Sequence, residues 1–438
     1  MLETVRNAFK LKEIRSRIIY TLLMLVVVRI GTQLPIPGVN GSYFSEWFSG
    51  NSGSAFGFFD AITGGSFEKM SVFALNITPY ITSSIIIQLL TIAIPKLEEL
   101  QKDGEEGRKK MTAITRYLTV ALALMESLAM AIGFGKSGLL LEYNALNIIT
   151  AVVTLTAGST VIMWIGERIT ENGVGNGISI VLTINIISRI PQDLTLLFEQ
   201  FVKGKEIAFQ VLNLAIIIAI IVAVTVLTVT LQGAERRIPV QYSRKVQGRK
   251  QIGGQSSYIP LKVNTAGVIP IIFAQSLFMF PLIIMQLLGK SGGNGIGGTI
   301  LKMLNQSNWC DFNEPIYSIG LIVYIVLVIA FAYFYTSITF NPLEIADNMK
   351  KQGGFIPGIR PGKPTSDYLT KILNYIIFIG AVGLVIVAVI PIFFEGAFNA
   401  SISFGGTSLI IIVGVIIETL KQIESRMLVR NYKGFLND

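Results

Sequence analysis

The sequence contains no histidine and only one cysteine, Cys310, in 438 residues. A disulfide framework needs cysteine pairs, and zinc sites or Cys–His catalytic pairs need residues that this chain does not supply. Charged residues are also scarce, at 14% of the chain, where soluble proteins carry about 25%. The composition therefore argues against a soluble enzyme, and we expect no metal, no cofactor and no covalent chemistry.

Two glycine-rich strings imitate nucleotide-binding loops. GKS occurs at 135–137 and at 289–291, but both copies lack the glycine that a P-loop places five residues before the Gly-Lys pair. Gly293, Gly295 and Gly298 complete a GxGxxG pattern, but no strand precedes it. The sequence predicts no nucleotide site.

Long apolar runs dominate the chain. Apolar residues make up 51% of it, the mean hydropathy is +0.61, and a helix of about twenty such residues crosses a hydrocarbon core about 30 Å thick. The runs lack the period of two that a membrane β-barrel requires. The sequence thus predicts an all-α membrane protein with ten transmembrane helices, at 18–34, 72–94, 117–135, 146–166, 176–190, 207–231, 266–288, 316–340, 372–392 and 401–417.

The distribution of positive charge predicts the orientation. With the N-terminus in the cytoplasm, 28 of the 36 Lys and Arg residues fall in segments that face the cytoplasm, as the positive-inside rule requires. Both termini are then cytoplasmic. Residues 1–17 are basic and amphipathic and have no cleavage site, so we expect a helix that lies on the membrane surface.

The ten runs divide into two groups of five, separated by a polar linker at 191–206. This division predicts an N-terminal half at 1–190 and a C-terminal half at 207–438, although no simple sequence repeat relates them. Two long cytoplasmic loops, at 232–265 and 341–371, are rich in turn-forming residues. Loops of this size commonly form a docking surface or a functional site.

The external segment at 35–71 is unusually apolar for a free loop. Phe56, Phe58, Phe59, Ile62 and Phe67 follow one another within it, but its glycines and short length prevent a membrane crossing. Two interpretations remain open from the residues alone. The segment is either a short half-helix tucked into the protein or a loop packed over the helix ends.

Charge is almost absent from the ten runs, where only Arg29, Glu126 and Arg189 are charged. Ion-coupled transporters place paired charges near the membrane midplane, whereas Glu126 stands alone there. A secondary transporter for a small solute is therefore disfavoured, and it stays as the alternative function.

Several strings, in order along essentially the whole chain, resemble the SecY family, the central channel subunits of the bacterial protein-export translocase. The strings are IIYTLLMLVVVRIGTQLPIPG at 18–38, ITPYI at 77–81, IIIQLL at 85–90, GVGNGIS at 173–179, PLKVNTAGVIP at 260–270, NPLEIADNMKKQGGFIPGIRPG at 341–362 and FGGTS at 404–408. Each string is short, but their joint occurrence at the boundaries of the apolar runs is specific.

The resemblance implies an hourglass channel, built from two pseudo-symmetric halves of five helices, whose waist is a ring of apolar side chains. A dry ring of this kind resists ions but yields to a polypeptide. By local alignment the ring comprises Ile77, Ile81, Leu182, Ile186, Ile272 and Ile411. Without the resemblance, each of these residues would be taken for an ordinary core residue.

The resemblance also assigns the apolar external segment and two further sites. The segment at 55–67 matches the plug that closes the idle channel, and its residues are Phe58, Phe59, Asp60, Ile62, Gly64, Gly65 and Phe67. A lateral gate, between spans two and three and spans seven and eight, would admit signal sequences to lipid. Its expected polar residues are Thr78, Gln88 and Asn264.

The long cytoplasmic loops become a docking surface in this interpretation. Basic side chains there would pair with ribosomal RNA phosphates or with acidic patches of the SecA motor ATPase. They are Arg244, Lys245, Arg249, Lys250 and Arg360, of which Arg360 matches the family most specifically and the other four also satisfy the positive-inside rule alone.

The resemblance implies that SecE and SecG subunits accompany the channel, which lies in the bacterial plasma membrane. The predicted function is a passive pore that exports unfolded secretory polypeptides and inserts membrane proteins sideways into the lipid bilayer. Signal sequences and nascent chains are its substrates, and SecA or the ribosome supplies the driving force.

Overall fold

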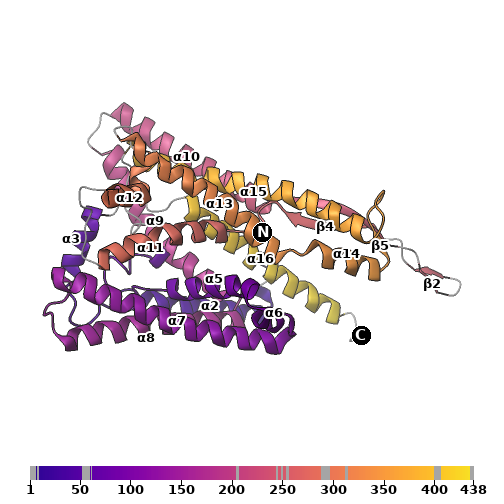
Figure 1. The fold of residues 1–438 in the computed structure, drawn as a ribbon, viewed down its shortest axis with the longest axis horizontal. Helices are drawn as coiled ribbons and strands as arrows, with labels where there is room; N and C mark the ends of the chain where they lie inside the picture. The colour runs from indigo at the N-terminus through magenta and orange to yellow at the C-terminus, as the bar shows by residue number, and fades with distance from the viewer. Residues whose placement is uncertain are drawn as a thin grey trace.

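The computed structural model describes residues 6, 9–51, 60, 62–203, 207–242, 245–247, 250–252, 256–287, 296–310, 314–398 and 406–434 (Figure 1). Helices dominate these residues, and each of the ten predicted runs overlaps a long helix. These helices are α2 (Lys12–Gly31), α5 (Thr78–Ala93), α7 (Gly104–Phe134), α8 (Ala145–Asn172), α9 (Gly177–Phe201), α10 (Ile207–Gly233), α11 (Ile269–Leu287), α13 (Ser318–Thr339), α15 (Lys363–Phe398) and α16 (Gly406–Gly434).

Six helical stretches of the described residues are long and apolar enough to cross a membrane, in α7, α8, α9, α10, α13 and α15. A seventh span results if α5 and α6 (Pro95–Lys102), which are bent by 110° to one another, count as one. The apolar part of α11 is shorter, and α2 carries basic residues near both ends. Length and composition thus establish fewer spans than the ten that the apolar runs predict.

The helices form two groups. In Figure 1, α2, α5, α7 and α8 lie on one side, α10, α13 and α15 lie on the other, and α9, α11 and α16 lie between them. Each group has its own apolar core, one around Phe44 and Leu155 and the other around Trp309 and Tyr324. Helix α16 packs against both α9 and α10, so it connects the two groups.

The short elements lie at the two ends of the molecule. Helix α6, helix α14 (Pro342–Lys351) and the strands lie toward one end, and α3 (Gly41–Asn51) and α12 (Ile296–Leu304) lie toward the other (Figure 1). The other short helices of the described residues are a π-helix at Gly135–Leu139 and 3-10 helices at Gln306–Asn308 and Pro315–Tyr317. This separation agrees with alternating loops on the two sides of a membrane.

The predicted loop 232–265 contains strands that the sequence analysis did not anticipate. They are β1 (Glu235–Tyr242), β2 (Lys245–Gln247), β3 (Lys250–Ile252) and β4 (Ser256–Lys262), and β5 (Gly354–Phe355) comes from loop 341–371. β1 pairs antiparallel with β4 and with β5, giving the order β4-β1-β5. The two loops therefore form one folded unit.

This unit has an apolar core of its own. Ile238 and Val240 of β1 alternate with exposed residues and pack with Met349 of α14 and Leu369 of α15. Because side chains alternate between the faces of a strand, this period of two is the signal for β1. The signal is weakened by Pro239 in β1 and Pro260 in β4, because proline is normally evidence against a strand interior.

Two helix boundaries differ from the predicted ones at the start of the chain. Residues 12–17, expected in a surface helix, form the first turns of α2, because Ile14 is buried against Val174 and Ile423. The second run was expected to begin at residue 72, but α5 begins at Thr78. Pro79 lies in the first turn of α5, where a missing N–H costs nothing.

The expected linker 191–206 is helical over most of its length. Helix α9 continues through Pro191 to Phe201, and Asp193 and Leu197 of this extension are buried. Proline is tolerated inside a membrane helix where neighbouring elements pack around it. The connection between α9 and α10 is therefore shorter than the polar composition suggested.

Candidate functional site

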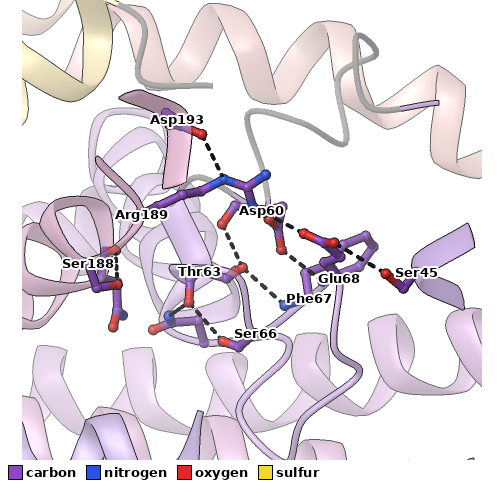
Figure 2. A network of polar contacts seen from close by, with 11 residues as sticks. Ser45, Asp60, Thr63, Ser66, Phe67, Glu68, Ser188, Arg189 and Asp193 are labelled. Atoms are coloured by element: carbon purple, nitrogen blue, oxygen red, sulfur yellow. Dashed lines mark hydrogen bonds and ion pairs between the residues drawn. The ribbon is translucent and has the colours of Figure 1, made fainter. Parts of the chain in front are cut away.

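We call residues 60 and 62–76, which precede α5, the α3–α5 segment, and hydrogen bonds close its first residues into a compact turn. Asp60 is fully buried, and its Oδ1 accepts a hydrogen bond of 2.8 Å from the backbone N of Glu68. Its carbonyl accepts hydrogen bonds of 3.1 Å from the backbone N of Gly65 and from Oγ1 of Thr63. These bonds close the chain on itself, as Figure 2 shows.

Further hydrogen bonds attach this turn to its neighbours. Ser66 Oγ donates to the carbonyl of Thr63 at 2.8 Å, and Asn76 Nδ2 donates to the same carbonyl at 3.3 Å. Ser159 Oγ of α8 donates to the carbonyl of Asn76 at 2.9 Å. The α3–α5 segment is thereby held against the N-terminal group of helices.

Gly64 brings the segment into contact with α9. Its φ of +69° suits glycine, and a Cβ placed there would lie 2.8 Å from the carbonyl oxygen of Asn185 and 3.0 Å from Nη1 of Arg29. No larger residue fits without displacing the α9 backbone. The segment and α9 are therefore in direct contact at this point.

Ile62 packs into an apolar cluster that we call the isoleucine cluster. Its buried members come from the segment, from α9 and from α16, and they are Ile62, Leu182, Ile186, Ile411 and Ile412. Four partly buried residues also pack against this cluster: Ile81 of α5, Ile190, Val268 and Val415. Side chains from five separate parts of the chain thus meet at one place: the segment, α5, α9, the residues just before α11, and α16.

Four of the six predicted ring residues belong to this cluster. They are Ile81, Leu182, Ile186 and Ile411. Ile77 is buried in an adjoining cluster with Val28 and Phe73, against which Ile81 also packs. Ile272 of α11 is partly buried, and Val268, one turn before it, contacts the isoleucine cluster. The predicted ring is therefore brought together in large part, with Ile77 and Ile272 at its margin.

The predicted plug residues occupy different environments. Phe58 and Phe59 lie outside the described residues, whereas Asp60 contacts Arg189 of α9 and Ile62 packs against Leu182 and Ile186 of the same helix. Phe67 instead packs in the apolar core around Phe44 and Leu155. Its ring contacts that of Phe44 edge to face, with the two ring centroids 5.2 Å apart. Gly65 has a φ of +79° and open space around it.

An ionic cluster that the sequence analysis did not predict joins α9 to the α3–α5 segment, and Figure 2 shows its charged side chains. On α9 it lies next to Ile186 and Ile190 of the isoleucine cluster. Arg189 of α9 forms an ion pair with Asp60, and its guanidinium lies 3.5 Å from Asp193 and 3.8 Å from Glu68. Arg189, Asp60 and Asp193 are all buried. We call these four residues the Arg189 cluster.

The sequence carried a partial signal for this cluster. Arg189 and Asp193 are four residues apart, and opposite charges at that spacing share a helix face. Nothing in the sequence indicated that Asp60 and Glu68, more than a hundred residues earlier, would join them. Within the ranges that the structure describes, no group of three His, Cys, Asp or Glu residues is placed to hold a metal ion.

The predicted gate residues lie on both groups of helices. Thr78 begins α5, Gln88 is exposed on the same helix, and Asn264 is buried just before α11. Thr78 Oγ1 and Asn264 Nδ2 are buried without a hydrogen-bond partner among the described residues. α7 and α11 contact each other across the boundary between the groups.

Of the predicted docking residues, the structure describes Arg360 in loop 341–371 and Lys245 and Lys250 in loop 232–265. Arg360 is exposed, and its carbonyl accepts a hydrogen bond of 2.9 Å from Oγ1 of Thr365. Lys245 lies on β2 and Lys250 on β3. Arg244 and Arg249 lie outside the described residues.

Comparison with known proteins gives a consistent result. A family model described as SecY matches residues 71–420. Curated proteins named "Protein translocase subunit SecY" are 41% identical in Halalkalibacterium halodurans and 44% identical in Streptomyces scabiei, and each alignment covers 100% of both chains.

Solved structures share the fold. One described as the structure of a protein conducting channel has a TM-score of 0.62 at 19% identity and covers 94% of this chain and 92% of its own. Sec61 in the canine ribosome-channel complex has a TM-score of 0.61 at 18% identity, with the same coverage. These likenesses confirm the predicted all-α membrane fold.

Proposed function

The chain belongs to the SecY family, and from that membership we propose how its parts conduct a polypeptide. It is a multi-pass membrane protein and a protein-conducting channel subunit of a translocase. The single observation that carries the proposal is the isoleucine cluster, in which Ile62 of the predicted plug packs against apolar residues of α9 and α16. A small-solute transporter is not supported by any of these relatives.

The isoleucine cluster would form the waist of the pore. Water in a narrow passage lined by isoleucine and leucine finds no hydrogen-bond partner, so the passage excludes ions when it is closed. The same side chains can separate around an extended polypeptide without breaking polar contacts. We therefore assign Ile77 and Ile272, at the margin of the cluster, to the same ring.

Sideways release would occur between α5 and α7 on one side and α11 and α13 on the other. Unpartnered polar atoms at Thr78 and Asn264 would be available for hydrogen bonds during this motion. Each such bond contributes about 0.6–2 kcal/mol in a membrane, so bonds formed as the gate opens would offset part of the cost of opening.

A second subunit would stabilise the boundary between the groups. An apolar groove of about 320 Å³ lies between α2, α9 and α16 and is lined by Ile18, Leu22, Ile180, Val415 and Ile416 among others. A transmembrane helix fits an apolar groove of this kind, and the family's SecE subunit is the partner that we propose for it. SecG is proposed on the family resemblance alone.

The sheet, α14 and the loop that bears Arg360 would form the docking surface for SecA or the ribosome, on the cytoplasmic side of the bacterial plasma membrane. Both termini would face the same side. The pore itself would be passive and would perform no covalent chemistry.

Crosslinking tests the pore directly. In a Cys310→Ser chain, Ile81→Cys, Ile186→Cys and Ile411→Cys should each crosslink to a secretory polypeptide arrested in transit. Val229→Cys, on the exposed face of α10, is the matched control and should not. In a chain that keeps Cys310, thiol reagents should react with it slowly, because burial raises the pKa of its thiol. Absence of crosslinks at all three ring positions, or equal crosslinking at Val229→Cys, would reject the pore.

An Arg360→Glu substitution should reduce SecA-driven export about tenfold, which corresponds to the loss of about 1.4 kcal/mol of charge pairing. The loop around Arg360 keeps its shape, because Ile356 is buried and Thr365 holds the Arg360 carbonyl. Export of a precursor by reconstituted vesicles measures the effect. Lys363→Glu, at the start of α15, makes the same charge change three residues away and should have a smaller effect. Normal export by the Arg360 variant would refute the docking role.

A further inference from the structure

The Arg189 cluster joins the predicted plug to a fixed helix by buried charge. Arg189 and Asp193 belong to α9, whereas Asp60 and Glu68 belong to the α3–α5 segment (Figure 2). The Arg189 side chain is 6% exposed, and those of Asp60 and Asp193 are 0% exposed. Three carboxylates therefore lie close to one guanidinium; two of them are fully buried, and the Glu68 side chain is 20% exposed.

The two sides of the cluster differ in how firmly they are held. Arg189 and Asp193 are one turn apart on α9, so their separation is set by the helix. Asp60 and Glu68 are connected to each other, because the Glu68 N–H donates to Asp60, and Ser45 Oγ of α3 donates to Glu68 at 3.3 Å. The ion pairs to α9 can therefore separate without breaking the hydrogen bond between Asp60 and Glu68, while the Asn76 end of the segment stays bonded to α8.

We propose that Arg189 is a positioning residue that holds the plug in the closed channel through its ion pairs with Asp60 and Glu68. The proposal rests on the pore and plug assignments of the proposed function. The ion pairs keep the segment against α9, and Ile62 is thereby kept in the isoleucine cluster. Opening breaks these pairs and leaves Arg189 with Asp193.

The charges suit a contact that must be stable but reversible. A buried charge is costly unless it is paired, so the closed state depends on Arg189. When the segment moves toward water, Asp60 and Glu68 regain hydration, and Arg189 keeps one carboxylate on its own helix. Neither side is left with an isolated buried charge, so separation costs less than breaking an ordinary buried ion pair.

Loss of Arg189 should therefore act differently from loss of the carboxylates. Arg189→Gln leaves Asp60, Glu68 and Asp193 close together without a cation, and like charges at this distance repel. The segment is then pushed away from α9. Asp60→Asn with Glu68→Gln removes the attraction without adding repulsion, and the new amide oxygen at position 60 can still accept the hydrogen bond from the backbone N–H of residue 68.

The test uses the complete translocase in vesicles, with resting ion conductance and export of a signal-defective precursor as readouts. Arg189→Gln should raise resting conductance about tenfold, and the double variant Asp60→Asn, Glu68→Gln should raise it about threefold. The triple variant, which combines all three changes, should conduct less than Arg189→Gln alone. Arg189→Lys should restore most of the seal. Lys69→Gln, in which the lost amine contacts Gln33 instead of the cluster, is the matched control and should conduct as the wild type does.

Each outcome decides the proposal. Wild-type conductance in Arg189→Gln, with normal export of a correctly signalled precursor, would overturn the role of Arg189 and leave the channel function standing. A triple variant that leaks more than Arg189→Gln would show a purely structural effect. If Arg189→Gln does not accumulate, the double variant decides, and an unchanged seal there would overturn the proposal. Failure of the wild type to translocate any precursor would instead reject the proposed function.

Discussion

An Ile411→Asn variant should export precursors with defective signal sequences and should leak ions at rest. Ile411 is 2% exposed in the isoleucine cluster, so an amide there would be buried against Ile62, Leu182 and Ile186 without a partner. An unsatisfied buried amide costs about 2 kcal/mol. In the open state the amide would meet water, so the closed state alone carries the penalty. The ratio of closed to open channels should fall about thirtyfold, at about 1.4 kcal/mol per factor of ten.

The matched control for this variant is the preceding residue. Ile410 is fully buried, but it packs in the C-terminal core with Ile271 and Leu384 instead of the isoleucine cluster. Ile410→Asn should therefore destabilise the folded protein without favouring the open channel. Export of a signal-defective precursor, relative to a normal one, separates the two effects. Equal stringency in Ile411→Asn and the wild type would remove this residue from the ring.

A Gly158→Ala substitution should lower the free energy of unfolding by about 2 kcal/mol, which is a usual cost of overpacking a core. A Cβ at Gly158 of α8 would overlap the carbonyl oxygen of Val72 and would lie 2.9 Å from its carbonyl carbon. The Val72 backbone cannot move away from the new Cβ as easily as the end of a flexible side chain could. The turn that carries Asn76 and leads into α5 would have to shift, and the Ser159–Asn76 hydrogen bond would be strained.

Gly414→Ala supplies the comparison for Gly158→Ala. A Cβ at Gly414 of α16 would have its nearest neighbour, Nε2 of Gln232, at 3.6 Å, which is ordinary contact. Because alanine favours a helix over glycine by up to about 1 kcal/mol, this variant should be neutral or slightly more stable. Thermal unfolding of the purified proteins in detergent measures both. Equal stability of the two variants would show that α8 can move away from Val72.

The sequence predicted the elements that depend on local composition. A run such as 207–231 is apolar on every face, and α10 occupies almost the same residues. Ring residues such as Leu182 and Ile186 were placed by family resemblance, since an isoleucine at a pore is chemically identical to one in a core. Their packing with Ile411 supports the assignment, and their role in the pore stays a prediction until crosslinking tests it.

Features that depend on contacts distant in sequence could not be predicted. Asp60 was assigned to the predicted plug by family resemblance, and nothing near it in the sequence indicated that it would pair with Arg189. The β1–β5 pairing joins residues more than a hundred positions apart, so no local period reveals it. Helix ends were extended past the apolar runs because polar residues such as Asp193 found partners inside the protein.

The three-stranded sheet connects the loop that bears Arg360, which is the proposed docking loop, to the helices. Strand β5, just before Arg360, is bonded to β1, which continues from α10, and β1 is bonded to β4, which leads toward α11. A partner that pulls on Arg360 therefore loads two helices at once, one of them beside the predicted gate. Ile238 and Val240 bury the inner face of the sheet against Met349 of α14 and Leu369 of α15, so a displacement of the sheet would also displace these helices.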